Sequence, residues 1–427
     1  MRVNVHDYSG HPFQVQLSRE LAARGHEVLH NYSAQYVTGH GRLTCTADDP
    51  STLRIEPVEC ASPLVKYSPA GRMRFELEYA DAWQAVLDRE RFDLVVSCNV
   101  PLFAVAKMRR YFERRQQPWL FWHQDIYSLA IGAEASRRLP GPLAALARRT
   151  VERMEARQVT SADGVVAITE AMTAQYRKWG LDAPHASVIP NWAPIDDIVP
   201  VDRDNAWAAE HDLPRGALRL LYAGTLGRKH NPMLLLQMLN DLRARDVLAV
   251  LVVASEGEGA DDLAAAAAGR PDVRIVGYQP AERFSEVLSS ADAVVALLER
   301  DAGKFSVPSK VLSYLSAGRP IVALMPADNP AADDVRAAGG FVGDPTSVGA
   351  IGAAAWLVRT AKDPAALESI GLRARALAEH RFDIARIADE FEDAFTRAAR
   401  LVPAPVRTPA AGLVPLLAPP QEERVEA

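Results

Sequence analysis

The sequence predicts an α/β protein of two domains, each built on a parallel sheet with helical crossovers, that face each other across a cleft. Strand-like apolar runs alternate with helix-like segments along almost the whole chain. A stretch rich in proline and aspartate, 191–216, interrupts this alternation, and a second series of strands and helices follows it. The length of 427 residues and the 48% of hydrophobic residues allow two cores of ordinary size.

The first series, in a domain expected over 1–190, has predicted strands at 2–5, 27–29, 94–97, 119–122, 164–168 and 187–189, with helices such as 14–24 and 142–157. Gly25 is a helix stop signal after the first of these helices. We interpret 191–216 as the linker between the domains.

The second series, over 217–382, has predicted strands at 219–223, 249–254, 273–276, 293–297 and 320–323, with helices that include 232–245, 280–290 and 308–317. A last helix is predicted at 383–400, and the proline-rich tail 401–427 is expected to be disordered. Open parallel sheets bind ligands at the carboxyl ends of their strands, so the cleft is the expected site.

Charge and cysteine content exclude several classes of protein. The net charge of −6 gives no electrostatic basis for binding nucleic acid. The three cysteines, Cys45, Cys60 and Cys98, form no disulfide or zinc pattern, which favours a reducing compartment. The N-terminus lacks the apolar segment of a signal peptide, and no apolar run is long enough to span a bilayer. We therefore expect a cytoplasmic protein that is soluble or peripheral to the membrane.

The strongest local signal is the stretch 222–232, YAGTLGRKHNP. An apolar strand runs into a turn at Gly224, two adjacent cations follow at Arg228 and Lys229, and Pro232 can open a helix. A helix N-terminus beside fixed cations suits a diphosphate. The alternative is a surface turn with two solvated charges, and local sequence does not decide between them.

A second signal, SVPSKVLSYLSAGRPIVA at 306–323, follows the predicted strand 293–297. Pro308 presets a helix start, and Ser309 places a hydroxyl near free backbone amides. This geometry offers an anion-binding nest, although an ordinary connection between a strand and a helix has the same pattern.

Together these stretches resemble the donor-binding half of family-4 glycosyltransferases, which have the GT-B architecture of two Rossmann-like domains. The VPSK…Y…AGRP run is similar to that of the bacterial subgroup that makes colanic acid, O-antigen or capsule. Further matches occur in the family's order at GHEV (25–28), ADGVVAIT (162–169), VIPNW (188–192) and VRIVGY (273–278). The resemblance covers roughly residues 1 to 400 and implies a final helix that returns toward the N-terminal domain.

The resemblance implies roles for individual residues. Arg228 and Lys229 would hold the donor diphosphate, together with Ser309, Lys310 and the amides of Val311 and Leu312. The other residues implied to line the donor site are Gly10, Gly224, Gly277, Tyr278 and Gln279, the last three around the nucleobase. By the same resemblance, His123 falls near the family's histidine that faces the donor sugar.

One departure concerns two glutamates that the family places in an E-x7-E pattern. Alignment from the GRP at 318–320 puts Phe305 and Ser313 at those positions, so both carboxylates are absent. Glu299 or Asp301 can substitute for them only if the preceding loop brings them close.

The expected reaction breaks a sugar–diphosphate bond, and cations and amides that meet the leaving charge lower its barrier. The resemblance implies retention of anomeric configuration, and no metal or other cofactor is required. The acidic pairs Asp48-Asp49 and Asp196-Asp197 lie among turn residues and are interpreted as solvated surface. If the chain supplies a base, the candidates are His123 and Asp125; for His123 the alternative is a packed structural histidine.

Residues 107–157 hold eleven Lys or Arg against five acids, in a protein that is acidic overall. Such a stretch can contact anionic lipid and present the N-terminal domain, the expected acceptor side, to a lipid-linked acceptor. Solvated helix faces explain it equally well.

Other functions stay open. The GT-B architecture also hosts sugar-nucleotide 2-epimerases and hydrolases, which need carboxylates near the sugar. A non-catalytic subunit that binds sugar nucleotides is a second alternative, favoured by the missing glutamates. A dinucleotide-dependent oxidoreductase is disfavoured, because no GxGxxG follows the first strand.

Overall fold

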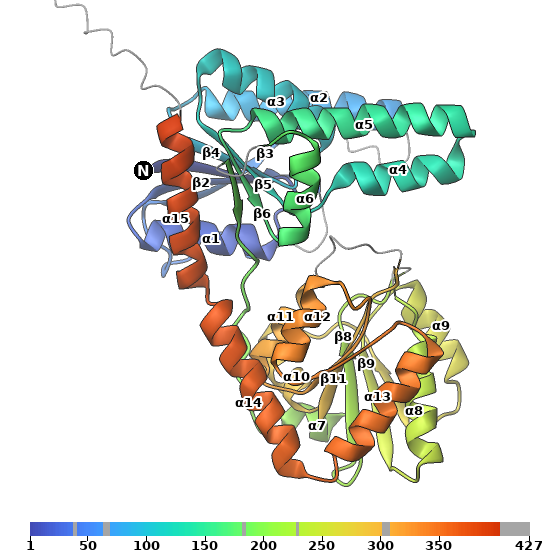
Figure 1. Cartoon of the computed structure of the whole chain (residues 1–427). Helices are drawn as coiled ribbons and strands as arrows, with labels where there is room; N and C mark the ends of the chain where they lie inside the picture. The colour runs from blue at the N-terminus through green and yellow to red at the C-terminus, as the bar shows by residue number, and fades with distance from the viewer. Residues whose placement is uncertain (37–40, 63–68, 182–184, 228–229, 301–307, 402–427) are drawn as a thin grey trace, which may run out of the picture.

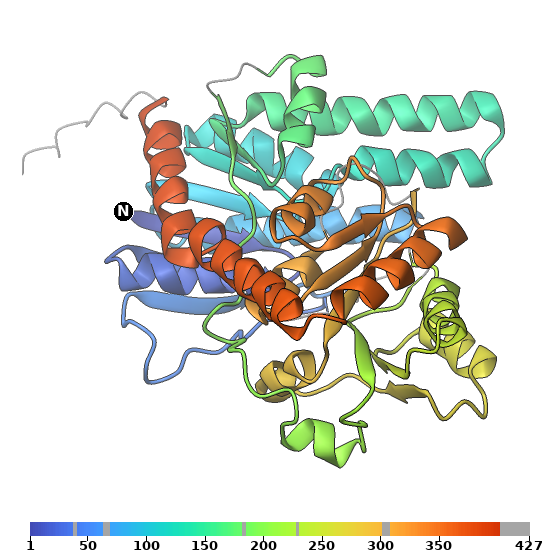
Figure 2. The same ribbon diagram turned by 60° about the horizontal axis from the view of Figure 1, so that its bottom comes forward.

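The computed structural model describes the chain except residues 37–40, 63–68, 182–184, 228–229, 301–307 and 402–427. It contains two parallel sheets, one in each half of the chain, with helices against both (Figures 1 and 2). This confirms the predicted two-domain α/β architecture. The tail 402–427 lies outside the described residues.

The first sheet has seven strands in the order β3-β2-β1-β4-β5-β6-β7, all parallel. The strands are β1 Arg2–Asp7, β2 Glu27–Ser33, β3 Leu53–Val58, β4 Leu94–Cys98, β5 Trp119–His123, β6 Gly164–Ala167 and β7 Ala186–Val188. The helices are α1 Pro12–Ala23, α2 Pro69–Leu87, α3 Leu102–Arg115, α4 Tyr127–Arg138, α5 Gly141–Ser161 and α6 Glu170–Lys178. The strand order reverses between β1 and β4, which places a crevice at their carboxyl ends.

The second sheet has six parallel strands in the order β10-β9-β8-β11-β12-β13 and reverses between β8 and β11. The strands are β8 Leu218–Ala223, β9 Ala249–Ala254, β10 Val273–Val276, β11 Ala293–Leu297, β12 Ile321–Leu324 and β13 Phe341–Gly343. The helices of this half are α7 Ala206–Glu210, α8 Met233–Ala244, α9 Glu258–Ala266, a 3-10 turn Ala281–Arg283, α10 Phe284–Ser289, α11 Ser309–Ser316, α12 Pro330–Ala337, α13 Ser347–Thr360 and α14 Pro364–Arg381.

The last helix, α15 (Ile384–Leu401), packs on the first half of the chain, as predicted (Figure 1). Phe391 and Phe395 are buried in the core formed with β4, β5 and α1. Arg24, the residue that follows α1, donates a 2.7 Å hydrogen bond to Glu392 of α15. The amphipathic pattern of α15 thus buries its apolar face against the domain where the chain began.

The stretch between the two sheets is folded against the second half. Trp207 of α7 is fully buried in its core, together with Ile195 and Ile198. Arg375 of α14 donates hydrogen bonds to the carbonyls of Ile195 and Ile198, at 3.2 and 2.7 Å. Much of the stretch read from sequence as a linker therefore belongs structurally to the second domain.

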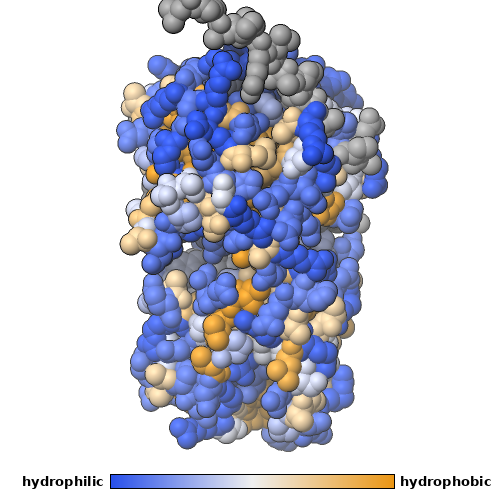
Figure 3. Space-filling model, turned by 90° about the vertical axis from the view of Figure 1, so that its left-hand side faces the viewer, coloured by the Kyte–Doolittle hydropathy of each residue, from blue (hydrophilic) through white to orange (hydrophobic). Residues whose placement is uncertain are grey.

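Phe13, at the start of α1, packs against the cores of both halves. Its ring meets that of Trp192 edge-on at 5.4 Å between centroids. The surface is hollowed between the two halves (Figure 3). The halves are thus joined by Phe13, Trp192 and the terminal helices.

Candidate active site

A glycine turn at the end of β8 forms one wall of the candidate site in the second half. Gly224 adopts a φ of +107°, which side chains rarely tolerate. Its amide is bound by the Ala254 carbonyl at 3.0 Å. The turn lies at the carboxyl end of β8, where the strand order reverses, so it occupies the expected ligand crevice.

Helix α11 is fixed to this turn by a buried tyrosine. The Tyr314 hydroxyl accepts a hydrogen bond from the Ala223 amide at 3.0 Å and lies 3.1 and 3.2 Å from the carbonyls of Ala223 and Val295. The side chain is fully buried. Helix α11 is thereby held against the end of β8 and the middle of β11.

Lys310 projects from the first turn of α11 toward the same place. Its ammonium donates a hydrogen bond to the Tyr222 hydroxyl and lies 3.9 Å from the centroid of the Tyr222 ring. A side chain at Gly224 would contact the Lys310 chain at 3.8 Å. Burial lowers the pKa of Lys310 to about 7. The lysine makes no ion pair with any residue that the structure describes, so this site has positive charge that an anion can neutralise.

A third segment, after β10, closes the site. The Tyr278 hydroxyl lies 2.8 Å from the Thr225 hydroxyl, which joins the β10 and β8 loops. Glu256, after β9, accepts the Tyr278 amide at 3.1 Å. Gln279 accepts a hydrogen bond from the Trp207 indole at 2.8 Å and donates one to the Gly277 carbonyl at 3.0 Å. Gly224, Lys310 and Tyr278, predicted from separate motifs, are therefore neighbours.

The remaining predicted donor residues divide into three groups. Ser309 is exposed at the start of α11. The Val311 amide donates to the Pro308 carbonyl at 3.0 Å, and the Leu312 side chain is buried. Arg228 and Lys229, like Phe305 at one missing-glutamate position, lie outside the described residues; Ser313, at the other, is half-buried on α11.

In the first half, the loop after β1 is held by a buried carboxylate. Asp7 accepts hydrogen bonds from the amides of Ser9 and His11, at 3.3 and 2.5 Å, and from the Asn99 side chain at 2.8 Å. Gly10 lies inside this loop with a φ of +67°. Burial raises the pKa of Asp7, although its hydrogen bonds oppose this. The geometry fixes the Gly10 backbone at the carboxyl end of β1.

His123, at the end of β5, is buried with a partner at each ring nitrogen. Nδ1 lies 2.8 Å from the Tyr176 hydroxyl and Nε2 lies 3.2 Å from a Glu155 carboxylate oxygen. Glu155 also accepts the amides of Tyr127 and Ser128 at the start of α4. His123 is 1% exposed, so its present contacts are those of a structural histidine. To act on a substrate it would have to leave one partner.

Asp125, two residues further, is exposed and makes no hydrogen bond or ion pair with any described residue. It lies close enough to the Cys98 thiol and the Tyr127 hydroxyl to help raise their pKa values, although burial is the main cause in both. Of the two proposed bases, Asp125 is therefore the accessible one.

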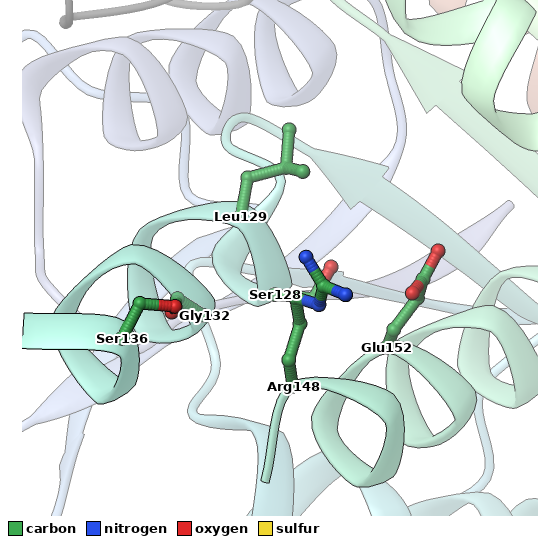
Figure 4. A pocket seen from close by; sticks show the side chains of 6 residues that line it. All are labelled: Ser128, Leu129, Gly132, Ser136, Arg148 and Glu152. Atoms are coloured by element: carbon green, nitrogen blue, oxygen red, sulfur yellow. The ribbon is translucent and has the colours of Figure 1, made fainter. Parts of the chain in front are cut away.

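A cavity of about 230 Å³ lies elsewhere, between α4 and α5 (Figure 4). It is lined by Ser128, Leu129, Gly132, Ser136, Arg148 and Glu152. None of the predicted site residues lines it. A Cβ atom at Gly132 would come within 3.0 Å of the Arg148 side chain, so the glycine allows the arginine to pack against α4.

Sequence reasoning did not find several residues that shape the site. Asp7, Asn99 and Tyr222 act through contacts with residues far along the chain, for which the sequence carries no local signal. Apart from these contacts, Asp7 and Asn99 could be singled out only by their positions at the end of β1 and just after β4, at the edge where parallel sheets bind ligands. Asn99, with a φ of +55°, is also a left-handed residue at this edge.

Two parallel sheets, joined by a C-terminal helix that returns to the first one, define the GT-B architecture. Two family models agree with this class. Residues 11–192 match the glycosyl transferase 4-like domain, and residues 217–356 match glycosyl transferases group 1. The chain therefore belongs to the family-4 glycosyltransferases, as the sequence motifs indicated.

Solved structures share the fold over nearly the whole chain. Sucrose-phosphate synthase from Thermosynechococcus elongatus has a TM-score of 0.68 and 16% identity, covering 93% of this chain and 98% of that one. Anabaena HepE, solved with UDP and glucose, has a TM-score of 0.65 and 14% identity, with coverage of 93% and 99%. WaaG, a glycosyltransferase involved in lipopolysaccharide biosynthesis, has a TM-score of 0.64 and 18% identity, with coverage of 92% and 99%. Among curated proteins, none matches this sequence.

Proposed function

We propose that this glycosyltransferase moves a hexose, with retention of anomeric configuration, from a UDP- or GDP-sugar to a glycan or lipid-linked acceptor, in the cytoplasmic synthesis of cell-surface polysaccharide. The observation that carries the proposal is the ammonium of Lys310, which Tyr222 holds beside the open Gly224 turn. A partly buried cation at a glycine turn and a helix start suits a diphosphate.

Two neighbours support the type of donor and the biological role. HepE has been solved with UDP and with UDP-glucose, and WaaG acts in lipopolysaccharide biosynthesis. In this chain, Gly277 and Tyr278 follow β10, and Tyr278 contacts Thr225 in the loop after β8, so a nucleobase can lie beside the diphosphate. The base itself, uracil or guanine, is left to experiment.

The proposed chemistry follows from the charges on the two sides of the reacting sugar. As the sugar–phosphate bond breaks, negative charge grows on the leaving diphosphate, and Lys310 with Arg228 and Lys229 stabilises it. Each charge-assisted hydrogen bond contributes about 1.5–3 kcal/mol. The leaving phosphate, or Asp125 on the opposite domain, takes the acceptor proton. These cations do the work that a metal does in other transferases, so no metal is proposed.

A thermal-shift panel of UDP, GDP and their sugars tests the donor site, because a bound ligand raises the melting temperature by mass action. We expect the melting temperature to rise with nucleotides of one base only. This shift should persist in EDTA and be largely lost in Arg228→Ala and Lys229→Ala. Lys362→Ala, at an exposed position of the second half, serves as the matched control and should keep the shift. Unchanged shifts in both site variants would place the diphosphate elsewhere.

Incubation with the donor alone separates the transferase from its alternatives. A transferase leaves the donor nearly intact until an acceptor is added. Free sugar or an epimer formed without acceptor would indicate a hydrolase or 2-epimerase, and tight binding without turnover on any acceptor would indicate a non-catalytic subunit.

A further inference from the structure

The most prominent surface feature outside the candidate site is the α4–α5 hairpin. The two helices pack side by side, joined by a short turn at Leu139 and Pro140. Figures 1 and 2 show the hairpin projecting beyond the rest of the first domain. A partner can therefore contact its end without touching the remainder of this acidic protein.

Large apolar side chains are exposed on this hairpin. Those more than a third exposed are Leu129 46%, Ile131 43%, Leu139 42%, Leu143 55% and Leu146 62%. The last three lie at or just after the turn. On the side of the molecule seen in Figure 3, apolar residues form small separate spots in a hydrophilic surface. Exposed apolar residues that gather on one projecting element mark a contact surface, whereas singly scattered ones do not.

Arginines follow the leucines along the outward face of α5. Helical periodicity places Leu143, Leu146, Arg153 and Arg157 on one face, opposite the buried Glu155. Arg149, Arg153 and Arg157 are exposed and form no ion pair with any described residue. By contrast, Arg137 and Arg138 pair with Glu134 in α4. The charge available to a partner therefore lies on α5.

The structure also separates this face from the rest of the basic stretch 107–157. On α3, Lys107 pairs with Asp81, Arg109 with Glu113 and Arg115 with Asp88. Much of the α3 charge is thus neutralised within the domain, and no comparable group of exposed leucines accompanies it. Within the described part of the basic stretch 107–157, exposed leucines occur together with unpaired arginines on the hairpin and not on α3.

We infer that the α4–α5 hairpin docks this enzyme on an anionic phospholipid surface. The leucines near the turn enter the interface between headgroups and acyl chains, and the arginines of α5 lie at headgroup level, as in interfacial amphipathic helices. The inference rests on the proposed function in one respect: a lipid-linked acceptor would be reached at such a surface.

A second copy of the chain fits this face less well. A two-fold contact through the hairpin would bring the same patch of each copy together, and the unpaired arginines would repel one another. A membrane with anionic lipids satisfies the apolar and the basic residues at once. Within the described residues no helix is long and apolar enough to cross a bilayer, so this contact is with the surface.

Flotation of the full chain with phosphatidylcholine vesicles, with and without phosphatidylglycerol, tests the inference. We expect binding only with the anionic lipid. Arg153→Ala with Arg157→Ala should weaken it by about fivefold for each arginine, and Leu143→Ser with Leu146→Ser by at least as much. Arg110→Ala with Arg114→Ala on α3, and Leu372→Ser on α14, are exposed controls that should keep binding.

The inference would be overturned if the protein does not bind vesicles, or if binding does not depend on lipid charge. It would also be overturned if hairpin and control variants lose binding equally, or if sedimentation shows self-association that depends on the hairpin. Melting temperatures confirm that each variant is folded. The shift caused by the nucleotide sugar is measured on the same samples. A normal shift without vesicle binding refutes only the docking surface, and vesicle binding without any shift refutes only the proposed donor site.

Discussion

The Lys310 ammonium lies 3.9 Å from the centroid of the Tyr222 ring, which comes from a strand 88 residues earlier in the chain. The aromatic face stabilises the cation, but burial removes water from it and lowers its pKa to about 7. Near neutral pH the lysine is therefore close to half protonated. An incoming diphosphate would draw a proton onto it.

Nucleotide-sugar binding should weaken as the pH rises above about 7. The protonated form of Lys310 attracts the diphosphate and the neutral form does not. Above the pKa of the free lysine, binding must therefore take up a proton, which costs about tenfold in affinity per pH unit. Calorimetric Kd values from about pH 6 to about pH 9 measure this dependence. In Lys310→Arg the guanidinium stays charged, so the dependence should flatten. An equally steep dependence in both proteins would assign the titration to another group.

The stability of the unliganded protein should show the reverse trend. Between about pH 7 and the ordinary pKa of 10.5, the unfolded lysine binds a proton that the folded one does not. Stability contributed through Lys310 therefore rises with pH in this window. Lys310→Met removes the titrating group, and its free energy of unfolding in urea should rise less over the same range. Parallel pH curves for the two proteins would contradict the lowered pKa.

Gly224→Ala should damage the donor site through the backbone. A Cβ at this position has ordinary room beside Lys310, but the φ of +107° is strained for any L side chain. We expect the free energy of unfolding to fall by about 1–2 kcal/mol, and kcat/KM to fall with it. Gly216→Ala is the control, because its Cβ would meet no atom within 4 Å and its φ is outside the left-handed region. Equal activity of the two variants would mean that the turn tolerates rearrangement.

Tyr314→Phe should loosen the contact between α11 and β8. Removing the hydroxyl leaves the buried Ala223 amide without its hydrogen-bond acceptor, which costs about 1–3 kcal/mol. Denaturant unfolding measures the loss. Tyr111→Phe, which removes a less buried hydroxyl bound to Asp88, should cost less. If the two substitutions cost the same, the Tyr314 hydroxyl does not hold the helix in the way described.

The parts of the fold and site that sequence could predict are those with local signals. Gly224 follows a mostly apolar strand, and Pro308 precedes a helix, so both positions were identifiable from neighbouring residues. The returning C-terminal helix followed from the family resemblance and is confirmed by the burial of Phe391. The edge strand β3 was not predicted, because Arg54, Glu56 and Pro57 interrupt its apolar pattern.

The parts that sequence could not predict depend on contacts between distant residues. Tyr222 binds Lys310 across 88 positions, and Asn99 binds Asp7 across 92. His123 was selected as a site residue by resemblance, but its ring meets Tyr176 and Glu155, respectively 53 and 32 residues away. Only the folded chain shows that these partners occupy both ring nitrogens.

His123→Leu should destabilise the protein more than it affects the chemistry of the folded fraction. Hydrogen bonds from His123 and Ser128 hold the pKa of Glu155 below its ordinary value, against the effect of burial. Removing the histidine leaves that carboxylate buried without its partner, a change that costs about 3–5 kcal/mol when the pair is ionised. Melting temperature and kcat per active site separate the effects. A stable but inactive variant would show that His123 acts on the substrate after all.

Asp125→Asn should have the opposite profile. The carboxylate is exposed and bound to no described residue, so its replacement by the isosteric amide should leave the melting temperature unchanged within the scatter expected of surface substitutions. If Asp125 takes the acceptor proton, kcat should fall by about 10²-fold or more, because an amide cannot serve as a base. The donor-induced thermal shift should persist, since the proposed diphosphate site lies in the other domain. Asp48→Asn, an exposed acid in a turn, is the control and should keep full activity. A kcat for Asp125→Asn close to that of the control would leave the leaving phosphate as the proton acceptor, and Asp125 would then have no part in the chemistry.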